Sequence, residues 1–145
     1  TIFGANGVIS GTQINANYAD VAERFASDVE MTAGTVVELG GSAEITSCID
    51  ELSENVFGVI STRAAYLMNS AAGSDITHPP IAMTGRVPVK VTGSIRKGDR
   101  LVAAGNGLAR AARPGEATAF NVIGRALEAK ESESLGVIEA IVTIK

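Results

Sequence analysis

Ala33-Gly34-Thr35-Val36-Val37-Glu38-Leu39-Gly40-Gly41 sets the architecture of this chain, because its plan returns 64 residues later as Lys97-Gly98-Asp99-Arg100-Leu101-Val102-Ala103-Ala104-Gly105. Each copy contains a turn with a glycine, a short apolar strand and a glycine-rich hairpin, followed by a polar loop. A strand with an internal glycine closes each copy, at residues 56–60 and 122–126. Stacked repeats need about three units to form a stable solenoid. Two units therefore predict one compact β-body with two related halves.

The composition favours short strands joined by tight turns. The chain has 145 residues, of which 46% are hydrophobic, but it contains no Trp and only 4% aromatic residues. Its core must therefore be built from Val, Ile, Leu and Ala, while sixteen glycines supply the turns. The formal net charge of −4 argues against a nucleic acid as the main partner, because phosphate binding needs a dense cationic face.

The sequence predicts no metal, no cofactor and no membrane contact. Cys48 is the only cysteine, so no intrachain disulfide can form, and its apolar neighbours favour a packed thiol over a nucleophile. His78 is the only histidine and precedes two prolines, which indicates a turn or surface residue rather than a general base. No apolar run approaches the roughly 18 residues that a membrane-spanning helix needs.

The first fourteen residues are expected to form an extended arm. Residues 1–14 are mildly apolar and are interrupted by Gly and Asn. Ile2, Phe3 and Val8 need a cover, either from the body of the domain or from a neighbouring subunit. We expect the arm to precede a β-rich domain at residues 15–145, with the internal duplication at about 30–62 and 94–128. Thr1 fits either removal of a starting Met or a processing cut.

Residues 15–24 are predicted to form a short N-terminal helix. Their apolar side chains recur at helical spacing, at Tyr18, Val21, Ala22 and Phe25. On such a helix, Asp20 and Glu23 would lie on adjacent turns. A solvated helix face is the simpler interpretation, and a carboxylate pair for acid–base hydrolysis is the alternative. The chain carries no catalytic signature beyond these two positions.

Two further segments carry specific expectations. Residues 85–93 alternate strictly, with Val87, Val89 and Val91 on one face and polar residues on the other. Pro88 predicts an edge strand or a bulge there, because proline lacks the amide hydrogen that a ladder needs. The long connection at residues 61–80 is expected to be functional or interfacial.

Residues 18–25, Tyr-Ala-Asp-Val-Ala-Glu-Arg-Phe, followed by residues 33–37, resemble the opening of a module near the C-terminal ends of tailed-bacteriophage fibre and appendage proteins. The similarity continues in order through five further segments: 57–62, 65–69, 79–82, 85–91 and 97–102. The resemblance implies a trimeric, β-rich part of a virion.

A related group, the glutamic-peptidase-like autoproteolytic chaperone domains of phage neck appendages, carries a Tyr-Ala-Asp/Glu element at this place. That kinship would assign autocleavage to Asp20 and Glu23. In outline, an arm followed by a glycine-rich β-body, the chain is also similar to phage capsid decoration proteins.

We therefore expect an all-β fold, a compact barrel or sandwich of two related halves with a short N-terminal helix and an extended arm. The expected function is that of a non-enzymatic structural protein of a tailed-bacteriophage virion, made in the host bacterial cytoplasm. It would assemble as a homotrimer, as a capsid decoration or a fibre/appendage module, and contact other virion proteins, with the major capsid protein as one candidate. The alternative is an autoproteolytic intramolecular chaperone domain of a phage fibre. A carbohydrate-binding tip is disfavoured because aromatic platforms are scarce. The residues expected at the assembly interface are Ile2, Phe3, Val8, Tyr18, Phe25, Tyr66 and Leu67.

Overall fold

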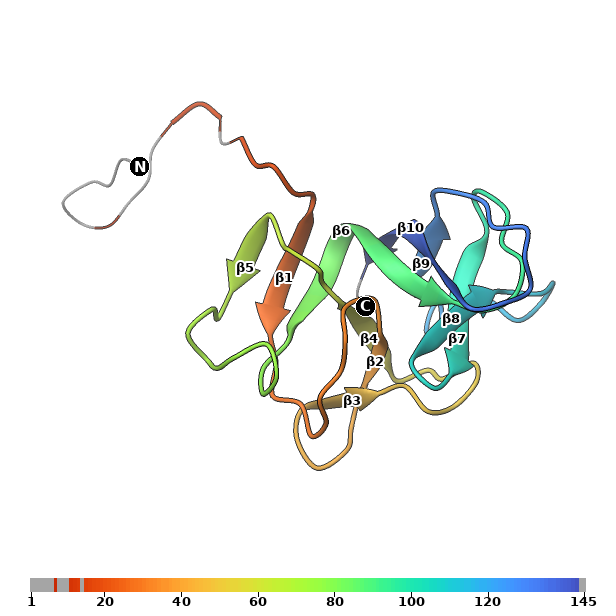
Figure 1. Ribbon diagram of the computed structural model, residues 1–145, viewed down its shortest axis with the longest axis horizontal. Coiled ribbons are helices and arrows are strands. Elements are labelled where there is room, and N and C mark those ends of the chain that lie inside the picture. Colours follow the sequence, from red (N-terminus) through yellow and green to blue (C-terminus); the bar gives the residue numbers. More distant parts are fainter. Residues whose placement is uncertain (1–6, 8–10, 14, 144–145) are drawn as a thin grey trace.

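The computed structural model describes residue 7, residues 11–13 and residues 15–143, and this part of the chain is all-β, without a helix (Figure 1). The expected fold class is thereby confirmed. The strands are β1 (Asp20–Arg24), β2 (Val36–Leu39), β3 (Ile45–Ser47), β4 (Val56–Ile60), β5 (Tyr66–Met68), β6 (Pro80–Val91), β7 (Arg100–Gly105), β8 (Leu108–Ala111), β9 (Gly124–Ala126) and β10 (Gly136–Thr143).

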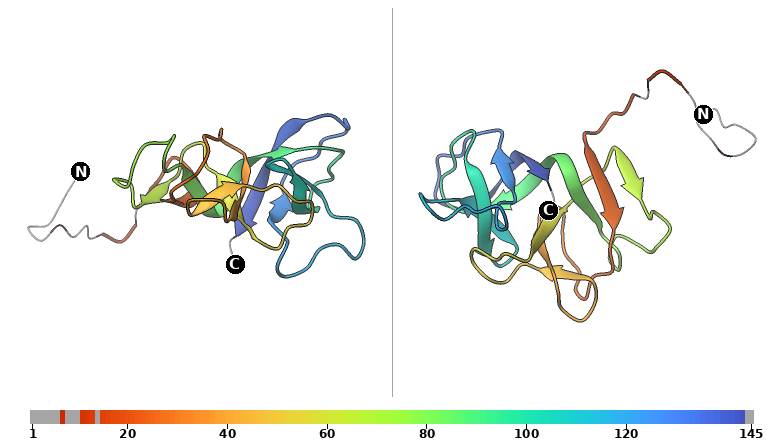
Figure 2. Two further views of the ribbon diagram at one scale, coloured as in Figure 1. Left: turned by 90° about the horizontal axis from the view of Figure 1, so that it is seen from below. Right: turned by 180° about the vertical axis from the view of Figure 1, so that it is seen from behind.

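Five strands close into a small barrel. β10 pairs with both β6 and β9, and β7 pairs with both β9 and β8. The ring closes where β8 returns to β6 in a parallel pair, Val91 with Ala109. The remaining strands extend from the first half of β6, with β4, β2 and β3 on one side and β5 beside β1 on the other (Figures 1 and 2).

β6 is the strand that the barrel and the outer strands share. Its second half pairs with β10 over the full length of that strand, and its first half pairs with β1 and β4. The alternation expected for residues 85–93 is present, since Val87, Val89 and Val91 are fully buried in the larger core. Their neighbours on the other face, such as Arg86, are partly or fully exposed.

The expectation of an edge strand at Pro88 is wrong, because β6 lies in the middle of the sheet. Pro88 pairs with Glu139 of β10 on one side. On the other side, the pairing with β4 ends at Ala82 and the pairing with β8 begins at Val91. Pro88 therefore occupies a gap between two neighbouring strands, where the missing amide hydrogen costs no ladder bond.

The predicted helix over residues 15–24 is also wrong, because this segment ends in strand β1. β1 lies between β6, to which it is antiparallel, and β5, to which it is parallel through pairs such as Val21 with Tyr66. A ten-residue helix is marginal in isolation, whereas a strand between two partners forms hydrogen bonds on both edges. Tertiary pairing has overridden a short run of helical spacing.

The two duplicated segments form the same local structure. Each has a hairpin whose first strand also pairs with the closing strand, β2 with β3 and β4, and β7 with β8 and β9. The amide of Gly34 donates to the carbonyl of Ile60 at 2.8 Å, and the amide of Gly98 donates to the carbonyl of Ala126 at 2.8 Å. Gly34 and Gly98 have φ angles of 87° and 91°, which L side chains rarely adopt.

Candidate functional site

Two of the residues expected at an assembly interface lie exposed where β1 and β5 begin. Tyr18 is 45% exposed and Tyr66 is 64% exposed. Arg63 donates a hydrogen bond of 2.7 Å to the Tyr18 hydroxyl, and its guanidinium carbon lies 5.3 Å from the centre of that ring. Leu67 is half-buried in β5. Among the described strands, β5 pairs with β1 alone, so its outer edge is open to a further strand.

The other interface candidates are placed differently. Phe25 is half-buried and belongs to the smaller core, where its ring meets Phe57 edge-to-face with centroids 4.9 Å apart. This contact explains the conformation of Phe25 without a partner subunit. Ile2, Phe3 and Val8 lie outside the described residues, so their role remains a prediction.

Asp20 and Glu23 are not brought together as a helix would have placed them. On a strand, side chains alternate, so residues three apart point to opposite faces. Asp20 is buried, only 3% exposed, whereas Glu23 is half-buried and pairs with Ile81 of β6. The structure therefore contains no Asp20–Glu23 carboxylate pair.

Asp20 nevertheless has an unusual environment. Neither its Oδ2 atom nor the hydroxyl of buried Ser61 makes a hydrogen bond with a described residue. Burial raises the pKa of the Asp20 carboxyl, and the proximity of Ser61 and of the Asp20 amide offsets this only in part. The carboxyl is thus biased toward its neutral, proton-carrying form.

Cys48 has the packed environment that its sequence neighbours indicated. Its side chain is fully buried, and its sulfur lies 3.8 Å from Glu38 Oε2. Burial, followed by the charge of Glu38, raises the pKa of the thiol to about 11. His78 lies in a loop, with Nδ1 at 3.0 Å from the Thr77 hydroxyl. No cluster of three metal-ligating side chains occurs among the residues that the structure describes.

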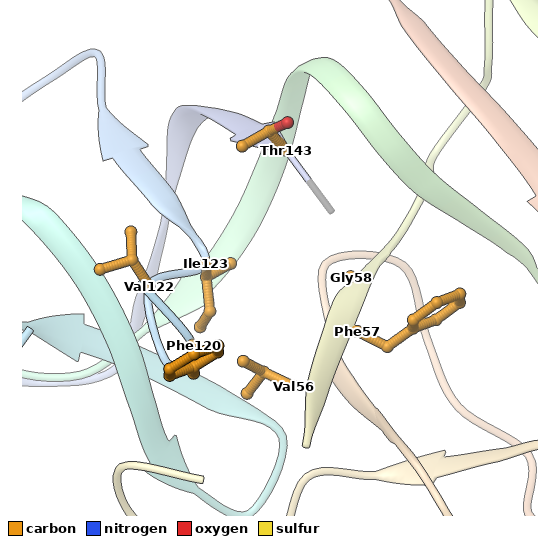
Figure 3. A pocket seen from close by; sticks show the side chains of 7 residues that line it. All are labelled: Val56, Phe57, Gly58, Phe120, Val122, Ile123 and Thr143. Atoms are coloured by element: carbon orange, nitrogen blue, oxygen red, sulfur yellow. The ribbon is translucent and has the colours of Figure 1, made fainter. Parts of the chain in front are cut away.

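A small pocket lies between β4 and the segment leading into β9 (Figure 3). Phe120, Ile123 and Val56 converge on it, whereas the ring of Phe57 points away. It has no titratable side chain in its lining, which comprises Val56, Phe57, Gly58, Phe120, Val122, Ile123 and Thr143. Such a lining offers shape and apolar contact but no acid–base chemistry.

One polar cluster, centred on Arg110, could not be predicted from the sequence. Arg110 of β8, whose side chain is 11% exposed, bonds the Glu51 carboxylate at 2.9 Å and both oxygens of Glu116 at 2.8 and 2.9 Å. These contacts connect the loop before β4 and the loop after β8 to the barrel. The only sequence signal was a basic residue in an otherwise apolar strand, and neither partner could be inferred from spacing.

The fold and its surfaces therefore define an all-β domain, a closed five-stranded barrel with outer strands, whose described residues form no recognisable catalytic centre. None of the described residues forms a helix that is long and apolar enough to cross a membrane. Neither a protein-family model nor the sequence of a curated protein matches the chain.

The fold is similar to two solved structures from bacteriophage phi29. The C-terminal fragment of gene product 12 aligns with a TM-score of 0.58 and 17% identity, over 87% of this chain and 100% of the fragment. The N base of head fiber gp8.5 aligns with a TM-score of 0.51 and 15% identity, over 85% of this chain and 93% of the other. The resemblance to phage fibre and appendage modules is thereby confirmed at the level of the fold.

Proposed function

We propose that the chain is a non-enzymatic structural module of a tailed-bacteriophage virion that assembles as a homotrimer. The observation that carries this proposal is the alignment with the whole gene product 12 fragment and with nearly all of the head fiber base. Both a capsid decoration protein and a fibre or appendage module are compatible with this fold. Its partners would be further copies of itself and other virion proteins, such as the major capsid protein, and it would be made in the host bacterial cytoplasm.

The β1–β5 edge supplies a surface suited to assembly. Tyr and Arg are the residue types enriched among the side chains that contribute most to protein interfaces, and Tyr18, Arg63 and Tyr66 lie exposed at this edge. The open edge of β5 could accept backbone hydrogen bonds from a neighbouring subunit. Together with Ile2, Phe3 and Val8, these residues could contribute to the roughly 2,000 Å² or more that an obligate interface buries.

Sedimentation equilibrium of the full chain tests this proposal. We expect a mass of three times the 14.8 kDa chain, and we expect Tyr66→Glu to shift the mass toward the monomer. Leu135→Glu is the matched control, because Leu135 is similarly exposed, at 67%. It directly precedes β10 where Gly136 pairs with Val91, whereas β1 pairs with the other end of β6, at residues 80–85. A wild-type protein that remains monomeric at micromolar concentration would overturn the proposal.

An autoproteolytic chaperone domain is the second candidate, and the environment of Asp20 is the observation that favours it. Burial raises the pKa of the Asp20 carboxyl, which favours the proton-carrying form that a general acid needs. A longer precursor with an added upstream segment should then cleave itself, and Asp20→Ala should stop the cleavage. Glu23→Ala is the comparison, because Glu23 lies on the opposite face of β1. A wild-type precursor that stays intact would exclude this candidate.

A further inference from the structure

Charge is strongly segregated along this chain. Residues 28–54 contain seven carboxylates and no Lys or Arg, whereas residues 84–130 contain nine Lys or Arg and three carboxylates. The first range, which we call the acidic segment, comprises β2, β3 and the loop that leads to β4. The second comprises most of the barrel. The two related halves of the fold therefore carry opposite charges.

Most of the carboxylates of the acidic segment face solvent. Only Glu38 is half-buried, while the exposed members are Asp28, Glu30, Glu44, Asp50, Glu51 and Glu54. Among the described residues, the one ion pair formed by this segment joins Glu51 to Arg110. Ile49, which is 66% exposed, precedes Asp50 and adds an apolar contact to this acidic surface.

On the barrel, three arginines form a row across four neighbouring strands. Arg86 of β6 is opposite Ile141 of β10, Ile141 is opposite Arg125 of β9, and Arg125 is opposite Arg100 of β7. Residues directly opposite in a sheet share a face, and all four of these are exposed. At about 4.8 Å per strand, the row spans roughly 14 Å. We call these three arginines, with Ile141 among them, the arginine row.

None of the three guanidinium groups of the arginine row forms an ion pair with a described carboxylate. Arg125 donates to the backbone carbonyl of Gly98, at 2.9 Å from Nε and 2.8 Å from Nη2. Arg86 and Arg100 make no hydrogen bond or ion pair with a described residue. In Figure 1, β3 lies along the lower edge of the domain and β9 and β10 lie at the upper right. Arg100 is the first residue of β7, whereas the acidic segment meets this strand near its other end, where Glu51 pairs with Ala104.

We propose that the arginine row docks against the acidic segment of a second copy of this chain. This inference rests on the self-assembly proposed above and specifies one of its interfaces. Different surfaces of the two copies meet, so the contact is heterologous, and repetition of such a contact can close a ring such as a trimer. Ile141 and Ile49 supply apolar contact within an interface that the charges orient.

A second copy fits the row better than a polyanion does. The arginine row surrounds an exposed apolar side chain, Ile141, which a nucleic acid or an anionic glycan would leave unused. The chain as a whole carries a net charge of −4, so a long polyanion would also meet its acidic segment and be repelled. The same asymmetry attracts a second copy when the arginine row of one copy faces the acidic segment of the other.

Sedimentation velocity of the full chain, at 0.05 M and 0.5 M NaCl, tests this interface. We expect salt to weaken the association of the wild type, because screening shortens the range of charge interactions. We expect Arg86→Glu/Arg100→Glu to raise the dissociation constant by roughly 100-fold or more, since like charges would face each other across the contact. Circular dichroism melting checks that each variant is folded. Arg125 is left unchanged because it holds Gly98.

Three further variants separate the contact from a general effect of charge. Arg96→Glu/Lys97→Glu makes the same change in net charge at two exposed residues outside the row, and it should associate like the wild type. Asp50→Lys/Glu54→Lys should weaken association, and a chain carrying both this pair and Arg86→Glu/Arg100→Glu should recover it. The inference would be overturned if neither Arg86→Glu/Arg100→Glu nor Asp50→Lys/Glu54→Lys weakened association. It would also be overturned if the chain that combines the two pairs did not recover association. In both cases a stable trimer could still form through another surface. A wild type that is monomeric in both salts would overturn the self-assembly itself.

Discussion

The guanidinium of Arg110 holds the carboxylate of Glu116 through two parallel hydrogen bonds, 2.8 Å from Nη1 to Oε1 and 2.9 Å from Nη2 to Oε2. The pairing is bidentate, a geometry that fixes orientation as well as contributing free energy. The backbone amide of Arg113 also donates to Glu116, at 2.7 Å. Glu116 therefore fastens the loop after β8 to the barrel.

Glu116→Gln is expected to lower the free energy of unfolding at neutral pH. The hydrogen bond to Arg110, followed by the bond from the Arg113 amide, lowers the pKa of Glu116 from 4.5 to about 2. A depressed pKa in the folded state contributes stability above the ordinary pKa, and this is lost as the pH falls from about 4.5 to 2. Urea unfolding at pH 7, 4 and 2.5 measures the effect. The variant should differ most from the wild type at pH 7, and equal stabilities there would contradict the assignment.

Asp20→Asn, in contrast to Glu116→Gln, is expected to raise the free energy of unfolding at neutral pH. Burial raises the pKa of Asp20 in the folded state, so the folded protein binds the proton more tightly than the unfolded chain does. Wild-type stability is therefore lost as the pH rises through that raised pKa, whereas a neutral amide avoids this loss. Melting temperatures from pH 3.5 to 8 provide the measurement. The melting temperature of the variant should exceed that of the wild type by a margin that grows as the pH rises. A margin that stays constant or shrinks would show that burial does not raise the pKa of Asp20.

Gly124→Ala is expected to disrupt the barrel. A Cβ atom at position 124 would meet the carbonyl oxygen of Ile141 and lie 2.9 Å from the Val142 Cα, both on the backbone of β10. Backbone cannot move aside as a flexible side chain can, so we expect a loss of about 3 kcal/mol or more. Gly11→Ala is the control, because a Cβ there finds no heavy atom closer than 3.7 Å. Denaturant unfolding compares the two, and a Gly124→Ala protein as stable as the control would show that β9 and β10 are packed differently.

Cys48 is expected to be inert in the folded protein. Its thiol is fully buried, and burial and the charge of Glu38 raise its pKa to about 11, so almost no thiolate forms at pH 8. A thiol-reactive chromogenic disulfide should react slowly with the native protein and rapidly in 6 M guanidinium chloride. Fast stoichiometric labelling of the native protein would show that Cys48 is accessible.

Sequence reasoning succeeded where the determining contacts are local. Alternation over residues 85–93 identified the buried valines of β6, and the paired glycines Gly34 and Gly98 marked two turns that need positive φ. The plan shared by the two halves identified a compact β-body because each hairpin is encoded within a few residues.

It failed where the partners are distant in the sequence. The helical spacing over β1 is misleading because the two strands that flank β1 come from residues more than forty positions further along the chain. Arg110 meets Glu51 across 59 residues, a pairing that no spacing rule indicates. The arginine row likewise exists only in the register of β6, β10, β9 and β7, although the segregation of charge that gives it meaning is visible in the sequence.

We propose that this chain is a structural part of a phage particle. The most direct test is immunogold electron microscopy of purified virions, with an antibody raised against the folded domain and an unrelated phage as the control. We predict gold at regular positions, over the head for a decoration protein or at an appendage for a fibre module. Particles that carry no label, while the antibody detects the protein in the lysate from which they were purified, would contradict the claim.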